Sequence, residues 1–105
     1  MAALGITDIW TYKQPRVALI SSGDEIIPVD GTPAPGQIRD INRYTVFHAL
    51  KKSGAIPSFI GISPDDPQAI KEHLTAAGKY HMILVSGGSS KGERDYITTS
   101  IEQLG

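Results

Sequence analysis

The sequence predicts an α/β domain with a mainly parallel sheet that is covered by helices on both sides. Three short apolar runs, "RVALI", "AIPSFIGI" and "YHMILV", have the length and composition of buried strands. Stretches with helical periodicity separate these runs, and strands that alternate with helices are typical of βαβ crossovers. The 105 residues are enough for one such domain.

The composition excludes several classes of function. A net charge of −1 argues against general nucleic-acid binding, which needs a basic surface. The sequence has no cysteine, so disulfides and thiolate metal sites are excluded. No apolar run approaches the roughly 20 residues that span a bilayer, and no signal-peptide pattern opens the chain. We therefore expect a cytoplasmic protein that contacts neither membranes nor nucleic acids.

The first half of the chain predicts a strand, a loop and a helix. The strand starts at Arg16 and runs into "SSGDE"; the stretch "PVDGTPAPGQ" that comes later is rich in proline and glycine and predicts a loop or a distorted hairpin. The run "INRYTVFHALKKSG" then predicts a helix with Asn42 as N-cap and Gly54 as C-cap. In the strand that follows, "AIPSFIGI", Pro57 is expected among the first residues.

The second half predicts two more helices around the last strand. Asp66 is a suitable N-cap and Pro67 suits the first helical position, while Ile70, Leu74 and Ala77 form one face. After the strand "YHMILV" and the turn "SGGSSKGERDY", one face of the last helix carries three apolar residues, Ile97, Ile101 and Leu104.

The first 14 residues do not continue this alternation of strands and helices. They are interpreted as the tail of a preceding domain or a linker, and residues 15–105 as the domain itself. The segment ends in an alternating, strand-like stretch, and we expect Trp10 and Tyr12 to pack against the first strand.

Acidic residues gather where the three predicted strands end. Ligands of open α/β sheets bind beyond the carboxyl ends of the strands. Six of the eleven acidic residues follow the strands directly: Asp24, Glu25, Asp65, Asp66, Glu93 and Asp95. Loops attract aspartate in any case, and Asp66 is explained by its capping role. The remaining acids indicate a shared site.

The glycine turn after the last strand predicts an anion site beside these acids. Backbone N–H groups of Gly87 and Gly88, at the start of a helix, suit a phosphate or another oxyanion. Carboxylates and phosphate can share one site when Mg²⁺ lies between them, since Mg²⁺ is usually held by one or two carboxylates and substrate phosphates. The alternative is that the glycines only satisfy the dihedral angles of the turn.

Other side chains give weaker signals. The histidines do not share metal-ligand spacing, and the serines near the strand ends, Ser90 among them, are interpreted as hydrogen-bond donors because no His–acid arrangement accompanies them. No Walker-type Gly-Lys-Ser/Thr motif is present. Lys91 and Arg94 suit either phosphate neutralisation or a solvated surface.

Four segments together resemble a known family. "RVALISSGDEI", "PGQIRDINRYTVFHALKKSGA", "IGISPDDPQAIKEHL" and "MILVSGGSSKGERDYI" are similar, in order and spacing, to the molybdopterin-binding domain of MoeA/gephyrin-type molybdopterin molybdenumtransferases. The resemblance covers about residues 15–105. It implies a three-layer α/β/α fold and a role in molybdenum cofactor biosynthesis, in which molybdopterin adenylate is cleaved with release of AMP and molybdate is inserted with the help of Mg²⁺.

The resemblance also implies roles for single residues. Glu25, Asp65 and Asp95 match the family's active-site acids and are the expected catalytic and metal-binding residues. The expected binding residues for the pterin-nucleotide substrate are the following: Asp24, Asn42, Ser86, Gly87, Gly88 and Ser90. The sequence departs from the family pattern at Ser22, at Ile41 and in the run from Ser89 to Gly92, where Lys91 bears on ligand preference.

The same resemblance sets expectations for the whole protein. A family segment that completes the pocket is expected after Gly105, so the chain is interpreted as an excised domain, inactive by itself, of a homodimeric enzyme. Two alternatives stay open: a nucleotide pyrophosphatase of the competence-damage-inducible type, whose Gly-Pro-Thr loop the turn does not match, and a pterin-binding sensor or scaffold without catalysis.

Overall fold

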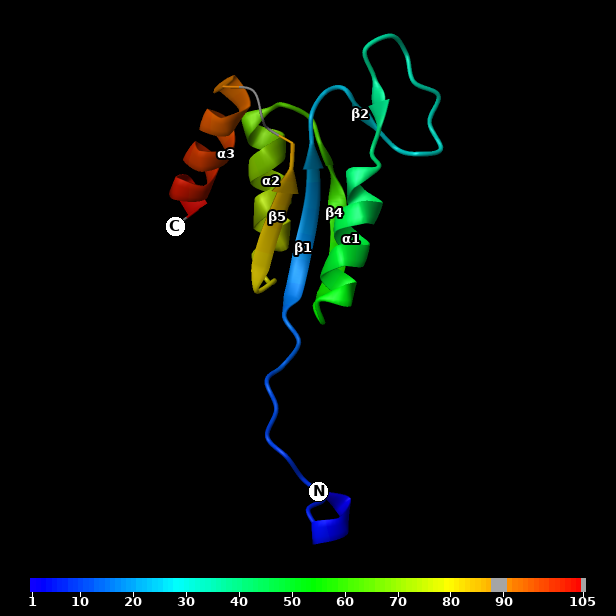
Figure 1. Cartoon of the computed structure of the whole chain (residues 1–105). Coiled ribbons are helices and arrows are strands. Elements are labelled where there is room, and N and C mark those ends of the chain that lie inside the picture. The colour runs from blue at the N-terminus through cyan, green and yellow to red at the C-terminus, as the bar shows by residue number, and fades with distance from the viewer. Residues whose placement is uncertain (88–90, 105) are drawn as a thin grey trace.

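The computed structural model describes the backbone of residues 1–87 and 91–104, and the side chains of residues 1–87 and 96–104. Its centre is a three-stranded parallel sheet formed by β1 (Arg16–Ser22), β4 (Ile56–Ser63) and β5 (Met82–Ser86), in the order β4-β1-β5. Three helices accompany it: α1 (Asn42–Lys52), α2 (Pro67–Ala77) and α3 (Lys91–Leu104) (Figure 1). The predicted α/β class and parallel sheet are confirmed.

The strand order explains why helices cover both faces of the sheet. The connection from β1 through α1 to β4 runs in one direction across the sheet, and the connection from β4 through α2 to β5 runs back past β1. Both crossovers are right-handed by rule, so reversing the direction places α1 and α2 on opposite faces. The third helix, α3, packs beside α2. The molecule therefore has the three layers that the sequence resemblance implied.

The central strand is buried on both sides. Ala18 and Ile20 of β1 form one core with the apolar face of α2, Ile70, Leu74 and Ala77. Val17 and Leu19 are also buried, and because successive side chains of a strand alternate, they lie on the face that α1 covers. Burying one Leu or Ile side chain stabilises the fold by about 1.5–3 kcal/mol. This core fixes the strand ends that carry the site.

The ends of the helices follow from local chemistry. The side chain of Asp66 accepts a hydrogen bond of 2.8 Å from the backbone N–H of Ala69, and Pro67 opens α2, as predicted. At the end of α1, Gly54 has φ +86°, its N–H bonds the carbonyl of Lys51, and the N–H of Ala55 bonds that of Leu50. This is the Schellman arrangement, which favours glycine at this position.

The prediction that Asn42 caps α1 was wrong. The N-cap is Ile41, which already has helical dihedral angles and makes no side-chain cap. The carboxylate of Asp40 instead accepts a hydrogen bond of 3.0 Å from the N–H of Arg43. The capping acid thus lies two residues before the asparagine that the sequence suggested.

The proline-rich segment is a loop and not a hairpin. The two strands that flank it, β2 (Ile26–Ile27) and β3 (Ile38–Arg39), pair in parallel, whereas a hairpin would make them antiparallel. Hydrogen bonds from the N–H of Ile38 to the carbonyl of Glu25, and from the N–H of Asp40 to that of Ile27, close the loop. They bring the chain back to the end of β1 before α1 begins.

The first 14 residues do not pack on the sheet. A short 3-10 helix, Ala2–Leu4, lies away from the sheet, and the chain runs from it to β1 in an extended form without strand pairing (Figure 1). Trp10 and Tyr12 are fully exposed, so the expectation that they pack against the first strand was wrong. Among the described residues, no helix combines the length and the apolar character that crossing a bilayer requires.

Candidate functional site

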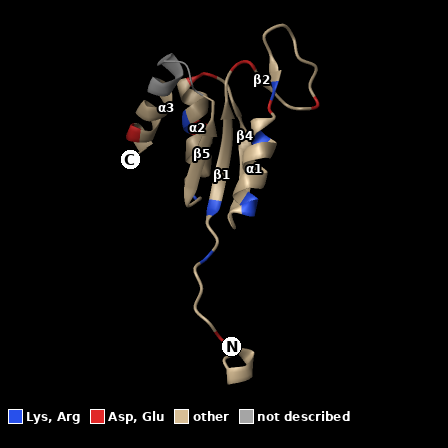
Figure 2. Ribbon diagram, in the orientation of Figure 1, with Lys and Arg blue, Asp and Glu red and all other residues tan. Residues whose placement is uncertain are grey.

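The carboxyl ends of the three strands lie together at one end of the sheet. Ser22 of β1 pairs with Ser63 of β4, and Ser21 pairs with Ser86 of β5, so the loops after the strands start side by side. Figure 2 shows acidic residues on the loops that follow β1 and β4 at this end. The strand-end acids of the first two loops are therefore neighbours in space, as the sequence predicted.

Asp24 and Asp65 hold each other through reciprocal hydrogen bonds. The backbone N–H of Asp65 donates to Oδ1 of Asp24 at 3.0 Å, and the N–H of Asp24 donates to Oδ2 of Asp65 at 3.4 Å. The hydroxyl of Ser22 also donates to Oδ1 of Asp65 at 3.4 Å. These bonds join the loop after β1 to the loop after β4, between residues 41 positions apart in the chain. Neighbouring carboxylates repel each other, and a cation bound between them would relieve that repulsion.

Glu25 lies over the glycine that begins the same loop. Gly23 has φ +144°, and a Cβ built there would lie 2.6 Å from Oε2 of Glu25. The N–H of Gly23 also bonds the carbonyl of Ser63 at 3.1 Å, which ties this turn to the end of β4. The dihedral angle favours a glycine here, whereas the glutamate carboxylate is the far end of a flexible side chain and could move away from a Cβ.

Asp65 and Asp66 are adjacent but have different roles. Asp66 is exposed and its carboxylate serves as the N-cap of α2. Asp65 is half-buried and turns to the loop after β1. The structure confirms the predicted capping role of Asp66 and places Asp65 with the strand-end acids.

Gly87 is required by the close approach of two strands' ends. Its φ is +127°, and a Cβ built on it would lie 2.0 Å from the carbonyl oxygen of Ser22. The loop after β5 can therefore pass beside the end of β1 only if this residue has no side chain. This contact supports the structural alternative for Gly87, independently of any anion that its N–H group might face.

A buried acid that the sequence analysis overlooked, Asp40, joins the end of β1 to the start of α1. Asp40 is 4% exposed, and its Oδ2 accepts a hydrogen bond of 2.6 Å from the hydroxyl of Ser21, near the end of β1. Its other oxygen caps α1 through Arg43. The bond joins the central strand to the start of α1, where the predicted site residue Asn42 is exposed. The signal was present in "RDIN", an acid three residues before a helical N–H group.

The remaining predicted site residues are only partly placed. Ser86 ends β5 and is half-buried, at the same end of the sheet as the acids. Gly88 and Ser90 lie outside the described residues, as does the side chain of Asp95. Among the side chains that are described, no group of three His, Cys, Asp or Glu residues is arranged to hold a metal ion. The predicted triad of Glu25, Asp65 and Asp95 consequently stays a prediction.

The comparison with family models gives a match over residues 18–105, to the family described as "Probable molybdopterin binding domain". The chain belongs to this family. The matched residues contain β1 from Ala18 onward, the whole of β4 and β5, and the three helices α1, α2 and α3.

Curated relatives and a solved structure agree with the molybdopterin-binding domain family. The chain is 37% identical over 106 aligned positions to the molybdopterin molybdenumtransferase of Nostoc sp. and 34% identical to that of Haemophilus influenzae, with all of the chain covered in both cases. The crystal structure of the molybdopterin biosynthesis MoeA protein of Pyrococcus horikoshii matches 99% of the chain with a TM-score of 0.82 and 33% identity.

The chain corresponds to only a part of these proteins. It covers 24% and 26% of the two curated relatives and 26% of the Pyrococcus protein. What the chain shares with them is one molybdopterin-binding domain, about a quarter of the length of each relative.

Proposed function

We propose that this chain is the substrate-binding domain of a molybdopterin molybdenumtransferase that acts in molybdenum cofactor biosynthesis. The observation that carries the proposal is the reciprocal pair Asp24–Asp65 at the carboxyl ends of the strands, in a chain of the molybdopterin-binding domain family. Relatives that contain the whole aligned domain are named molybdopterin molybdenumtransferases, which supports the assignment.

The proposed ligand is molybdopterin adenylate, and the reaction of the whole protein is molybdate insertion with release of AMP. The acids at the strand ends suit Mg²⁺, a cation that prefers oxygen ligands and is usually held by one or two carboxylates with substrate phosphates. Asp65, Glu25 and Asp95 are the residues proposed to hold it. When bound, Mg²⁺ would neutralise phosphate charge and so ease cleavage of the link to AMP.

The chain's own residues would orient this ligand. Ser22 and the N–H of Asp24 fix the Asp65 carboxylate, so that its direction is set before the ligand binds. Asp24, Asn42, Ser86 and Gly87 are proposed to line the pocket with Gly88 and Ser90. Residues 15–105 are proposed as the domain, residues 1–14 as its link to a preceding one, and the whole protein as a cytoplasmic homodimer without nucleic-acid or membrane partners.

Adjacent acids provide a matched test of this proposal. Asp65→Asn and Asp66→Asn are made in a protein that contains this domain together with the rest of the enzyme, and molybdate insertion is assayed. We expect Asp65→Asn to lower kcat/KM by about 100-fold or more, a typical contribution of a group at the reacting centre. Asp66→Asn should change it less than about threefold, since asparagine caps helices as well as aspartate does.

Stability separates this effect from unfolding. Both variants should melt within a few degrees of the parent, because neither replacement removes an apolar group from the core. Equal losses of activity in the two variants, or a loss in Asp65→Asn that follows a loss of stability, would contradict the proposed division between ligand-binding and capping acids.

A further inference from the structure

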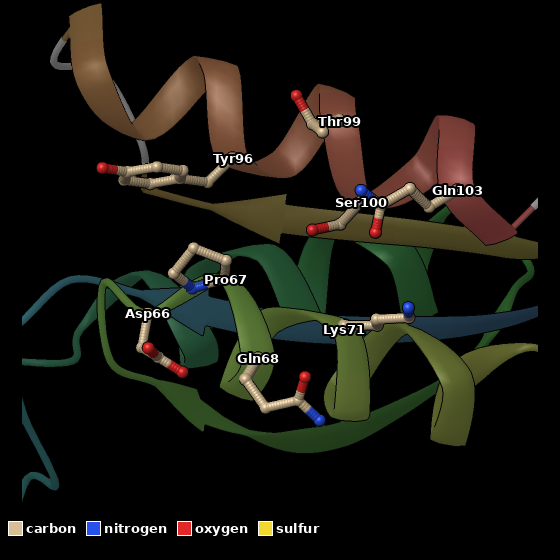
Figure 3. Close-up of a pocket in the computed structure, with 8 residues that line it drawn as sticks. All are labelled: Asp66, Pro67, Gln68, Lys71, Tyr96, Thr99, Ser100 and Gln103. Atoms are coloured by element: carbon tan, nitrogen blue, oxygen red, sulfur yellow. The ribbon is translucent and has the colours of Figure 1, made fainter.

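A groove between α2 and α3 lies outside the strand-end site. It has a volume of about 520 Å³ and is lined mainly by side chains from the start of α2 and from one side of α3. Figure 3 shows Tyr96 over Pro67 at the end next to Asp66, and Lys71, Ser100 and Gln103 toward the other end. Pockets of 300–1,000 Å³ hold small organic ligands.

Ser100 is the buried polar residue that points to a ligand here. It is only 3% exposed, yet its hydroxyl makes no hydrogen bond within the described part of the chain. Three other hydroxyls, two within helices and one at the C-cap of α1, bond the carbonyl four residues earlier: Thr45 at 3.3 Å, Ser53 at 3.0 Å and Thr75 at 2.7 Å. Buried polar groups are rarely left without a partner, because losing hydration without a replacement bond costs free energy.

The hydroxyl of Ser100 opens on the groove. Among the described side chains, no fully enclosed nitrogen or oxygen lacks a hydrogen-bond partner. Since Ser100 has no such partner and lines the groove, the small accessible part of its hydroxyl must face that space. A ligand in the groove can therefore reach a donor that is already held in place by the packing of α3.

The charge of the groove is positive at the same end. Lys71 forms no ion pair with the described residues, and the nearby carboxylate of Asp66 is bound to the N-terminus of α2. Lys71 follows Asp66 by five positions, which is about 7.5 Å along the helix axis. An anion beside Lys71 is thus separated from the acid, and it meets three kinds of donor: an ammonium, the Ser100 hydroxyl and the Gln103 amide.

At the opposite end of the groove two rings lie beside the capping carboxylate of Asp66. Tyr96 is 43% exposed, and its ring and that of Pro67 line the groove together. A planar ring can pack on such a surface, since aromatic side chains gain from stacked or edge-on contacts with other rings. The groove therefore offers a place for an anion at one end and for a flat apolar group at the other.

We propose that this groove is a second ligand site, which binds a phosphomonoester of a small ring compound. The phosphate lies at Lys71, Ser100 and Gln103, whose donors suit its several acceptor oxygens. The ring lies against Tyr96 and Pro67. The site is separate from the acids at the strand ends and does not depend on the function proposed for them.

Titration with phenyl phosphate tests this site, followed by the shifts of backbone amide signals in NMR spectra of the 105-residue chain. We expect the largest shifts at Lys71, Ser100 and Gln103. Inorganic phosphate should bind more weakly because it lacks the ring, and phenol should bind more weakly because it lacks the charge. Shifts that gather at Asp24 and Asp65 instead would overturn the proposal, since the anion would then belong to the strand-end site. Phenyl phosphate that shifts no signals would overturn it as well.

Variants show which side chains carry the binding. Lys71→Met should weaken phenyl phosphate binding by about tenfold or more, the usual effect of removing a charged hydrogen-bond donor, and Ser100→Ala should weaken it by a smaller factor. Lys52→Met, on the exposed end of α1, is the matched control and should leave the affinity unchanged. Equal losses in the two lysine variants would mean binding by net charge alone and would contradict a specific site. An unchanged affinity in Lys71→Met would do the same.

Discussion

Replacing Gly87 by alanine tests how the turn after β5 is built. The Cβ of the variant would lie 2.0 Å from the carbonyl oxygen of Ser22 and 2.9 Å from its carbonyl carbon. Both atoms belong to the backbone of the central strand, so no side-chain rotation removes the clash. The φ of +127° adds a second cost, because residues other than glycine rarely adopt this backbone angle.

The expected loss of stability can be worked out from these two terms. An unfavourable backbone conformation costs about 1–2 kcal/mol, and forcing extra atoms into a packed region costs about 1–3 kcal/mol. Gly87→Ala should therefore lower the free energy of unfolding by roughly 2–5 kcal/mol. With about 4–8 °C for each kcal/mol in a domain of this size, the melting temperature should fall by at least about 8 °C.

Gly36 provides a matched control for the steric term. It also has a positive φ, +85°, but a Cβ built there meets no atom within 4 Å. Gly36→Ala should cost only about 1–2 kcal/mol, which is the conformational term alone. Thermal melts of the two variants, followed by circular dichroism, decide the matter. If the two alanines destabilised the chain equally, the contact with Ser22 would contribute nothing and the account of the turn would be refuted.

Three further predictions follow from the described contacts. Asp40→Ala should destabilise the chain by about 2–4 kcal/mol in urea unfolding, because it leaves the Ser21 hydroxyl and the Arg43 N–H without their partner. An unchanged unfolding midpoint would contradict this role of Asp40. Asp66→Ala should cost about 1 kcal/mol by loss of the cap, whereas Asp66→Asn should cost only a few tenths, and equal costs would exclude capping. The fluorescence maximum of Trp10, the single tryptophan, should stay the same when the chain unfolds, since its side chain is already exposed; a shift would show that the tail packs.

The strands and helices were predictable because their signals are local. The apolar runs are separated by helical periodicity, and Asp66–Pro67 marks the start of α2 by chemistry that acts within one turn. The order of the strands was not predicted; once the structure gives it, the rule of right-handed crossovers explains the three layers that the resemblance implied. The expectation that the acids after β1 and β4 lie at one end of the sheet came from a different rule, that the carboxyl ends of parallel strands lie together and carry the ligand site.

The contacts that shape the site were less predictable because they join distant residues. Asp40 is fixed by a hydrogen bond to Ser21, and Asp65 by bonds to a loop 41 residues earlier. Sequence reasoning assigned the cap of α1 to Asn42 since asparagine is a good N-cap, but the return of the chain through β3 places Asp40 where it can bond both the helix and β1. The prediction for residues 1–14 was wrong because an alternating pattern does not by itself fix a partner: the segment pairs with no strand, although among the described residues β4 and β5 are each paired on one side only.

A binding titration tests the central claim most directly. Molybdopterin adenylate is titrated calorimetrically into the unsubstituted chain and into its Asp65→Asn variant, each with and without Mg²⁺. ADP-ribose is titrated in the same way as the competing nucleotide. We expect the parent to bind molybdopterin adenylate at least about tenfold more tightly with Mg²⁺ than without it, a difference of roughly 1.4 kcal/mol, and Asp65→Asn to lose that difference. Equal affinity with and without Mg²⁺, or a preference for ADP-ribose, would contradict the claim that the strand-end acids form a magnesium-dependent site for the pterin nucleotide.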